Sequence, residues 1–184
     1  MIVVAEGEKI KIRPISLEDV PQFVKWWNDG ELMASVGFSR GLGVTEAKLY
    51  DDFSEEISDP SSLRERRRYV VLDKVNDLPI GELVYGQLDL AENKCRIGIK
   101  ICELSYQGKG FGKDALVTFI LFLFNHFDLQ KIEIDTLADN LRAYSLYKKV
   151  GFRETKKESK FWQDPDGIWH DVIFMEMEKP EFQY

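Results

Sequence analysis

The sequence lacks any apolar run long enough to cross a membrane. A membrane-spanning helix needs about 20 consecutive apolar residues, and no stretch of the 184 residues comes near that length. The first residues, Met-Ile-Val-Val-Ala-Glu-Gly-Glu, also lack the basic segment and the apolar core of a secretory signal. These absences predict a globular protein of the cytoplasm that makes no contact with a membrane.

Cysteine and histidine are scarce, with two residues of each type. Cys95 and Cys102 lie in one expected strand at an odd spacing, so their side chains point to opposite faces, too far apart for a disulfide bond. Free thiols suit a reducing compartment, and we expect both cysteines to be packing residues. His126 and His170 belong to no cluster of metal ligands, which predicts that the protein holds no metal.

Basic residues are outnumbered, since 25 Lys and Arg stand against 32 Asp and Glu, for a net charge of −7. This balance is unfavourable for binding nucleic acid and compatible with a cationic amine substrate. Acidic residues gather within and just after an expected helix, at Asp51, Asp52, Glu55, Glu56 and Asp59. They would either attract such a substrate or form a solvated face whose charge is balanced by the arginines at 64 and 66–68.

No repeat, low-complexity tract or linker interrupts the chain, and 44% of its residues are hydrophobic, which predicts a single domain over residues 1–184. Alternating and helical periodicities predict about seven strands and about four helices. The expected strands are 9–15, 68–73, 79–90, 94–102, 131–137, 152–163 and 168–178. The expected helices are 17–29, 45–58, 115–127 and 140–150, with a helical turn at 32–34.

This element order indicates an α/β (α+β) fold with a mixed, mostly antiparallel sheet and flanking helices. Strand, helix and strand across residues 96–137 imply one parallel pair with a right-handed crossover. In the first helix the core-facing residues are Val20, Phe23, Val24 and Trp27. Trp26 falls outside this stripe, where it would line a substrate pocket or serve as another core tryptophan, and Gly30 is placed to end the helix.

A glycine-rich loop, Gln107-Gly-Lys-Gly110-Phe-Gly112, joins the fourth strand to the most apolar helix. Glycines at a helix start expose N–H groups that favour an anion such as phosphate, although they would equally allow a tight turn and close packing. The loop is not a P-loop, because Gln107 and Asp114 occupy the places of a required glycine and hydroxyl residue. It is not a dinucleotide fingerprint either, because the third glycine would fall at Lys113.

The Gln107-x-x-Gly110-x-Gly112 loop and several other segments resemble the GCN5-related N-acetyltransferase (GNAT) family, most of all its RimJ/RimL branch, over residues 8–178. The similar segments are Ile12–Ile15, Glu18–Val20, Trp27–Asp29, Ile97–Ile101, Asn140-x-x-Ala143-x-x-Leu146-Tyr147-x-Lys149-x-Gly151-Phe152 and Asp166-Gly167-x-Trp169-x-Asp171. The resemblance implies the GNAT fold, with a splayed central parallel pair, and the transfer of an acetyl group from acetyl-CoA to a primary amine. One departure is Arg96, where many relatives carry a glutamate.

By the same resemblance, acetyl-CoA is held by the splayed strand and by the loop. The implied cofactor-binding residues are Ile101, Cys102, Gln107, Gly108, Lys109, Gly110, Phe111, Gly112, Asn140 and Tyr147. Tyr147 matches the tyrosine that protonates the departing thiolate, whereas periodicity alone places it in the core. Asn140 matches an asparagine that binds the cofactor arm, and it is also placed to cap a helix.

For the general base the sequence offers Asp89, Glu82, Glu103 or a water chain, and it favours none of them. The acceptor stays open among protein N-termini, polyamines, aminoglycosides and amino sugars. A non-catalytic acetyl-CoA-binding regulatory domain is the competing function: Tyr147 favours the enzyme, and Arg96 in place of glutamate favours the regulatory domain. Relatives commonly dimerise through terminal strands, so a homodimer is one assembly that the resemblance suggests.

Overall fold

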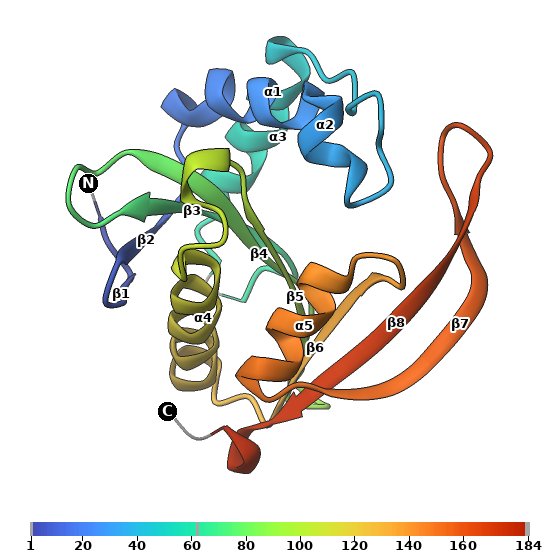
Figure 1. The fold of residues 1–184 in the computed structure, drawn as a ribbon. Coiled ribbons are helices and arrows are strands. Elements are labelled where there is room, and N and C mark those ends of the chain that lie inside the picture. The colour runs from blue at the N-terminus through green and yellow to red at the C-terminus, as the bar shows by residue number, and fades with distance from the viewer. Residues whose placement is uncertain (1, 62, 183–184) are drawn as a thin grey trace.

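A computed structural model describes residues 2–61 and 63–182 of the protein. An eight-stranded sheet runs through the molecule, with helices on both of its faces (Figure 1). The strands are β1 (Ala5–Glu6), β2 (Ile10–Pro14), β3 (Arg67–Asp73), β4 (Pro79–Asp89), β5 (Lys94–Ile101), β6 (Lys131–Leu137), β7 (Arg153–Gln163) and β8 (Trp169–Glu178). The helices are α1 (Val20–Asn28), α2 (Gly30–Ala34), α3 (Glu46–Ser58), α4 (Phe111–Phe127) and α5 (Leu141–Val150), with 3-10 turns at Leu17–Asp19, Leu104–Tyr106 and Lys179–Glu181.

The order of the strands in the sheet is β1-β2-β3-β4-β5-β6-β8-β7. Neighbours from β1 to β5 are antiparallel, β5 and β6 are parallel, and β6, β8 and β7 are antiparallel again. This arrangement confirms the predicted mixed, mostly antiparallel sheet with one parallel pair. The number of strands exceeds the expected number by one, because the two-residue β1 is too short to show an alternating pattern.

The parallel pair splays after three residues. Lys94–Arg96 of β5 pair with Lys131–Glu133 of β6. Beyond these pairs, all within the described chain, β5 continues to Ile101 and β6 to Leu137 without pairing to each other. The edge of β5 that faces β6 therefore has backbone groups free of any neighbouring strand over its second half.

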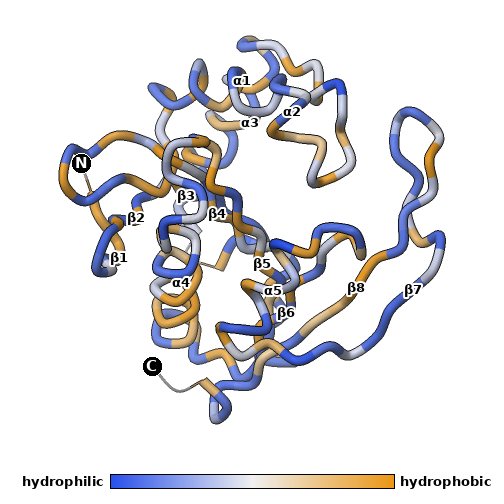
Figure 2. The backbone as a smooth tube through the Cα atoms, viewed as in Figure 1, coloured by the Kyte–Doolittle hydropathy of each residue, from blue (hydrophilic) through white to orange (hydrophobic). Residues whose placement is uncertain are grey.

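The hydrophobic core has two clusters, one on each face of the sheet. Alternate residues of β3 divide between them, since Tyr69 and Val71 join the first cluster and Val70 and Leu72 join the second. The first cluster packs under α4 and α5, and it explains why α4 is apolar on most sides (Figure 2). The second cluster packs α1 and α3 against the opposite face. The two layers leave the end of β5 between them.

The structure corrects the predicted face of α1. Trp26 is 2% exposed and belongs to the second core cluster, whereas Val24 and Trp27 are only half-buried. The buried stripe is Val20, Phe23 and Trp26, at a spacing of three residues, because α1 packs against α3 as well as against the sheet. Trp26 is therefore the further core tryptophan, and Trp27 is the one that reaches the edge of the helix.

The helix ends follow the predicted glycine chemistry in one case and differ in another. Gly151 adopts a left-handed φ of 114° and ends α5, as predicted. Gly30 does not end α1, because Asp29 is its C-cap and Gly30 begins α2. A Cβ at Gly30 would clash with the carbonyl oxygen of Ser39, so close packing explains this glycine.

The acidic cluster of α3 is largely ion-paired within the protein. Lys48 pairs with Asp52 at 2.6 Å, Arg64 pairs with Glu55 at 3.3 Å and with Asp59 at 2.9 Å, and Arg68 pairs with the buried Glu56 at 2.5 Å. The neighbouring arginines therefore counter these acids, as one of the two interpretations expected.

Both cysteines are free and buried, as expected for packing residues. Burial raises the pKa of Cys95 to about 12 and the pKa of Cys102 well above its ordinary value. Of the helices in the described ranges, none has the length and apolar content needed to cross a membrane. The same ranges contain no group of three or more side chains of the types that bind metal.

Candidate active site

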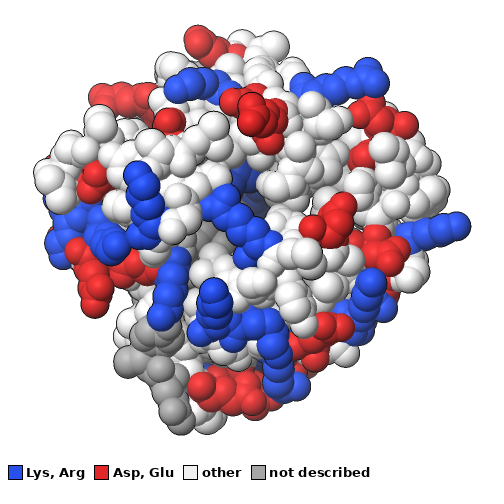
Figure 3. Space-filling model, viewed as in Figure 1, with Lys and Arg blue, Asp and Glu red and all other residues white. Residues whose placement is uncertain are grey.

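A cleft of about 610 Å³ opens between α2, the end of β5, the glycine loop and α5. Its walls include Glu31, Leu32, Ser35, Ile99, Lys100, Ile101, Leu104, Gln107, Gly108, Gly110, Gly112, Lys113, Arg142, Ala143, Ser145, Leu146, Tyr147 and Lys149. Lys and Arg side chains gather around the central hollow of the surface (Figure 3). A protein of net charge −7 thus has a cleft with a cationic rim, which favours an anionic ligand.

The glycine loop turns into α4 at this cleft. Gly108 and Gly110 have φ of 73° and 88°, in the left-handed region that other residues rarely adopt. Gly110 is the N-cap of α4, so the first N–H groups of the helix, from Phe111 onward, have no acceptor inside it. A Cβ at Gly112 would lie 3.5 Å from Ile101 Cγ1 and 3.7 Å from Leu146 Cδ2. Gly112 therefore keeps the gap between β5 and α5 open.

The side chain of Gln107 is bonded inside the protein. Its Nε2 donates to the carbonyl oxygen of Ile101 at 2.7 Å, and its Oε1 accepts from Arg142 Nη1 at 2.5 Å. These two bonds join the loop to the end of β5 and to the start of α5. Gln107 thus fixes the distance between two walls of the cleft, and it holds the Arg142 guanidinium at the rim.

Tyr147 lies in the wall of the cleft, with only 5% of its surface exposed. Burial, assisted by the negative charge of Asp135, raises the pKa of its hydroxyl well above the ordinary value of 10.0. Among the described residues none forms a hydrogen bond with this hydroxyl. The hydroxyl keeps its proton at neutral pH, and because its donor is not used by a described residue it can reach a group bound in the cleft. Tyr147 is therefore buried, as periodicity predicts, and it also lines the cleft.

Asn140 acts as the N-cap of α5 in the structure. Its Oδ1 accepts the N–H of Ala143 at 3.1 Å, and its Nδ2 donates to the carbonyl oxygen of Ser35 at 3.0 Å. The second bond ties α5 to the end of α2 across the cleft. Both polar atoms of the side chain are engaged in this arrangement, so the capping role is present and Asn140 also holds the cleft closed at one end.

Three other predicted residues lie beside the cleft and do not line it. Cys102 turns into the second core cluster, and its N–H donates to a carbonyl oxygen of β4 at 2.8 Å. The ring of Phe111 packs edge-on against Tyr106, with 5.0 Å between the ring centroids. Lys109 accepts a bond on its carbonyl oxygen from the ammonium of Lys9 at 2.9 Å. The structure thus brings Ile101, Gln107, the three glycines and Tyr147 together in one cavity.

The three carboxylates considered as a general base lie in different places. Asp89 accepts two backbone N–H groups in the β4–β5 turn, at the end of β5 opposite to the glycine loop. Glu103 accepts an indole N–H of α1 at 2.8 Å and an amide of the same helix at 3.2 Å. Glu82 accepts the indole N–H of Trp27 at 3.1 Å and lies 3.4 Å from Lys100 Nζ. Because Lys100 lines the cleft, Glu82 is the candidate that is coupled to it.

Arg96 occupies the last paired position before β5 and β6 separate. Its guanidinium lies 3.4 Å from Glu133 and 3.4 Å from Asp135, both on β6. Burial raises the pKa of Asp135 in spite of the nearby Arg96 charge. The departure from the usual glutamate therefore places one cation and two carboxylates at the base of the splay.

The lining residues that escaped the sequence analysis include Glu31, Ser35, Lys100 and Arg142. Lys100 and Arg142 stand inside similar segments, but nothing local in the sequence shows that they line the cleft, so only the fold reveals it. Glu31 and Ser35 belong to a segment of weak periodicity whose position depends on tertiary contacts. The exposed edge of β5, the glycine backbone and the cationic rim together fit an extended anionic molecule such as acetyl-CoA.

Comparison with known proteins agrees with this geometry. Residues 9–153 match the family model described as Acetyltransferase (GNAT) domain. The N-acetyltransferase 9-like protein of Nematostella vectensis is 26% identical over 165 residues, covering 84% of this chain and 80% of that protein. The aminoglycoside N(6')-acetyltransferase type 1 of Klebsiella pneumoniae is 25% identical over 164 residues, covering 82% of this chain and 77% of that protein.

A solved structure of spermidine N-acetyltransferase from Vibrio cholerae, in complex with CoA and spermine, has the same fold. It superimposes with a TM-score of 0.84 at 20% identity, covering 95% of this chain and 98% of the other. The family match extends over most of the chain, from β2 to the start of β7. The chain therefore belongs to the GNAT family of acetyltransferases, and it is an acyltransferase whose co-substrate is acetyl-CoA.

Proposed function

We propose that the protein acetylates a primary amine on a small molecule, as a RimJ/RimL-like member of its family and as a single domain over residues 1–184. The observation that carries the proposal is the Tyr147 hydroxyl, which lies in the wall of the cleft and has no hydrogen-bond partner among the described residues. The names of two relatives support an amine acceptor, since one is an aminoglycoside acetyltransferase and one a spermidine acetyltransferase.

The neutral amine attacks the thioester carbonyl carbon of acetyl-CoA, so that a C–N bond forms, the C–S bond breaks and coenzyme A leaves as a thiolate. The nitrogen releases its extra proton to water, and the phenol that protonates the sulfur is restored from water. In the proposed mechanism Tyr147 holds a proton at its hydroxyl oxygen and donates it to the departing sulfur. Backbone N–H groups of Gly108–Gly112 and of the first turn of α4 bind the pyrophosphate. Backbone groups of β5 around Ile101 orient the thioester toward Tyr147.

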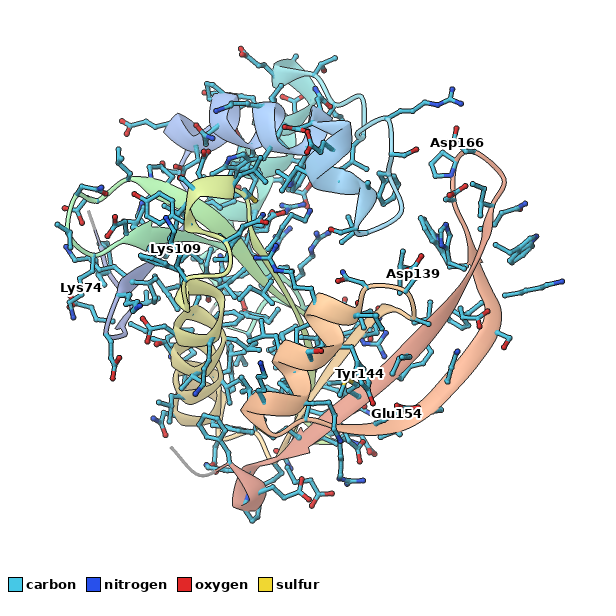
Figure 4. All side chains as sticks on the ribbon, viewed as in Figure 1. Lys74, Lys109, Asp139, Tyr144, Glu154 and Asp166 are labelled. Atoms are coloured by element: carbon cyan, nitrogen blue, oxygen red, sulfur yellow. The ribbon has the colours of Figure 1, made fainter. Side chains whose placement is uncertain are left out.

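Contacts between the α2–α3 loop and the β7–β8 hairpin support a small acceptor. The Phe38 and Trp162 rings lie 5.4 Å apart. Asp166, at the tip of the hairpin in Figure 4, accepts a bond from Ser39 Oγ at 2.9 Å and pairs with Arg40 at 2.7 Å. The same loop begins at Ser35 in the cleft wall, so these contacts restrict access beside α2. An extended polypeptide would have to separate them, whereas a small amine would not.

The test is release of free thiol from acetyl-CoA in the presence of single amines. The panel holds spermidine, an aminoglycoside, glucosamine and a peptide with a free N-terminus. We expect turnover with at least one small amine to exceed turnover with the peptide. Turnover confined to the peptide would reject the small acceptor, and no thiol release with any member would contradict the proposed reaction.

Replacing Trp162 by alanine tests the acceptor side of the cleft. Loss of the indole removes the contact with Phe38, so we expect KM for the amine to rise by roughly tenfold. The Kd of acetyl-CoA should stay within about twofold, because Trp162 does not line the cofactor cleft. Phe161→Ala is the matched control, since Phe161 is half-exposed and packs on Phe174 instead. Equal effects of the two variants on KM would count against the assigned acceptor side.

A further inference from the structure

Lys9, in the turn just before β2, reaches the glycine loop from a distant part of the sequence. Its Nζ donates to the carbonyl oxygen of Lys109 at 2.9 Å and lies 5.5 Å from the centroid of the Phe111 ring. A Cβ placed on Gly110 would be 3.5 Å from the same Nζ. Figure 4 labels Lys109 at the N-terminal end of α4, on the side of the N-terminal strands. The ammonium therefore lies directly beside the backbone that forms the loop.

The backbone of Lys9 is held in this place by α4 itself. The Asp114 carboxylate accepts the N–H groups of Glu8, Lys9 and Ile10 at 3.1, 2.7 and 3.2 Å. Gly7 completes the turn, where a Cβ would lie only 2.5 Å from the same carboxylate. Since Asp114 belongs to the first turn of α4, Lys9 and the glycine loop form one fixed unit. The position of the ammonium is thus preorganised.

The other lysines of the N-terminal hairpin have acidic partners, and Lys9 differs from them. Lys11 pairs with Asp77 at 2.7 Å, and Lys74, beside the same turn, pairs with Glu6 at 3.3 Å. Within residues 2–61 and 63–182, no carboxylate forms an ion pair with Lys9. An ammonium has three donors, and the Lys109 carbonyl uses one of them. The charge and two donors remain available at the loop.

We propose that Lys9 is a ligand of the pyrophosphate of acetyl-CoA, pairing with a phosphate oxygen while it keeps its bond to Lys109. The proposal rests on the pyrophosphate position assigned under the proposed function. It adds a charged contact from outside the loop to the neutral N–H groups of the loop and helix. Bonds to a charged oxygen are stronger than neutral ones, so this contact should carry a measurable share of the affinity.

The experiment compares Lys9→Met with Lys11→Met by calorimetry on the full chain. Met keeps most of the apolar stem and removes the charge, and Lys11 lies on the same hairpin away from the loop. The ligands are acetyl-CoA, 3′-dephospho-acetyl-CoA and acetyl-pantetheine, which lacks every phosphate. For Lys9→Met we expect about tenfold weaker binding of the first two and unchanged binding of the third. Lys11→Met should match the wild type with all three, and Lys9→Arg should retain most of the affinity.

Each other outcome has a definite meaning. Wild-type affinity of Lys9→Met for acetyl-CoA, with an unchanged melting temperature, would overturn the proposal. If Lys9→Met binds acetyl-CoA more weakly than the wild type but binds 3′-dephospho-acetyl-CoA equally well, the proposal is also overturned. Lys9 would then contact the 3′-phosphate and not the pyrophosphate. An equal loss for acetyl-pantetheine would show a general disturbance of the cleft. If the wild type binds acetyl-CoA no tighter than acetyl-pantetheine, the glycine loop does not bind phosphate. That result would reject the pyrophosphate site of the proposed function, and it differs from the results that reject only the role of Lys9.

Discussion

Tyr147 gives the sharpest prediction for a single residue. Tyr147→Phe removes one hydroxyl and keeps the ring that packs against Phe152. We expect kcat to fall by roughly 100-fold, because a general acid contributes on the order of 10²–10⁴-fold and a thiolate leaves readily even without it. The Kd of acetyl-CoA should change little. Turnover with a small amine, measured beside the Kd and the melting temperature, checks this expectation.

The melting temperature separates catalysis from packing in that variant. The Tyr147 hydroxyl has no hydrogen-bond partner among the described residues, so its loss should not destabilise the fold. Wild-type turnover would refute the role as an acid. A parallel loss of stability and activity would instead point to a structural role in the core.

Gly112 tests the cofactor gap without disturbing the backbone. Gly110, with its φ of 88°, is a poor choice because any side chain there strains the loop. At Gly112 a Cβ meets Ile101 and Leu146 at ordinary contact distances, so Gly112→Ala should fold normally. The added methyl group occupies the gap between β5 and α5, and we expect acetyl-CoA to bind about tenfold more weakly. Gly86→Ala, with no close neighbour, is the control, and unchanged calorimetric affinity at Gly112 would contradict the assignment.

The sequence predicted residues that line the cleft where they belong to a contiguous motif, as with Gly110, Gly112 and Tyr147. It gave no sign that Lys9 reaches the glycine loop or that Arg142 lines the cleft, because these positions depend on contacts across 100 and 35 residues of chain. The sequence predicted Trp27 on the core face of α1, whereas the structure buries Trp26, and the cause is again a tertiary contact. A stripe of period 3.6 predicts one face, and packing against a second helix selects a slightly different one.

At the scale of elements, Asp114 joins the start of α4 to the turn before β2. Asp114→Ala leaves three backbone N–H groups without their acceptor. We expect the free energy of unfolding to fall by about 2 kcal/mol, the range for hydrogen bonds to a charged group. Because the turn also carries Lys9, acetyl-CoA should bind more weakly while acetyl-pantetheine is unaffected. Denaturant unfolding and calorimetry measure the two effects, and Asp51→Ala, at an exposed position of α3, is the control.

An Asp114→Ala protein as stable as the wild type would mean that the turn is held by its own strand pairing.

Elements that form by local periodicity could be predicted from the sequence, whereas those held by contacts between distant residues could not. Alternation placed seven of the strands within about two residues of their ends. The start of α4 was placed four residues late, at Ala115 instead of Phe111, because glycine has low helix propensity and the left-handed Gly110 cap sets the start. Neither β1 nor the contact of the hairpin tip with the α2–α3 loop leaves a local signal.

For the whole molecule we predict alkaline sensitivity. Burial raises the pKa of Tyr69 and Tyr147 far above 10.0, and it raises the pKa of Tyr85 and of Cys95 to about 12. In each case the unfolded chain loses its proton at a lower pH than the folded chain. The free energy of unfolding should therefore be constant through neutral pH and fall as the pH rises past the ordinary values of 9.0 and 10.0.

Thermal unfolding between pH 7 and pH 11 measures this effect. Tyr69→Phe removes one of the buried acids, so its melting temperature should fall less steeply above pH 10 than that of the wild type. A melting temperature independent of pH up to 11 would show that these groups are solvated more than their burial indicates.

The separation of β5 from β6 after Arg96 has a mechanical consequence. The sheet consists of two halves, β1 to β5 and β6 with β8 and β7, which share three residue pairs. Strand pairing holds each half together, whereas the two halves are joined by these three residue pairs and by the first core cluster. A cofactor arm lying along the free edge of β5 would contact both halves of the sheet and would hold them together while it is bound. Loading the donor would then stiffen the protein, and the return of compliance after the reaction would set how fast coenzyme A can leave.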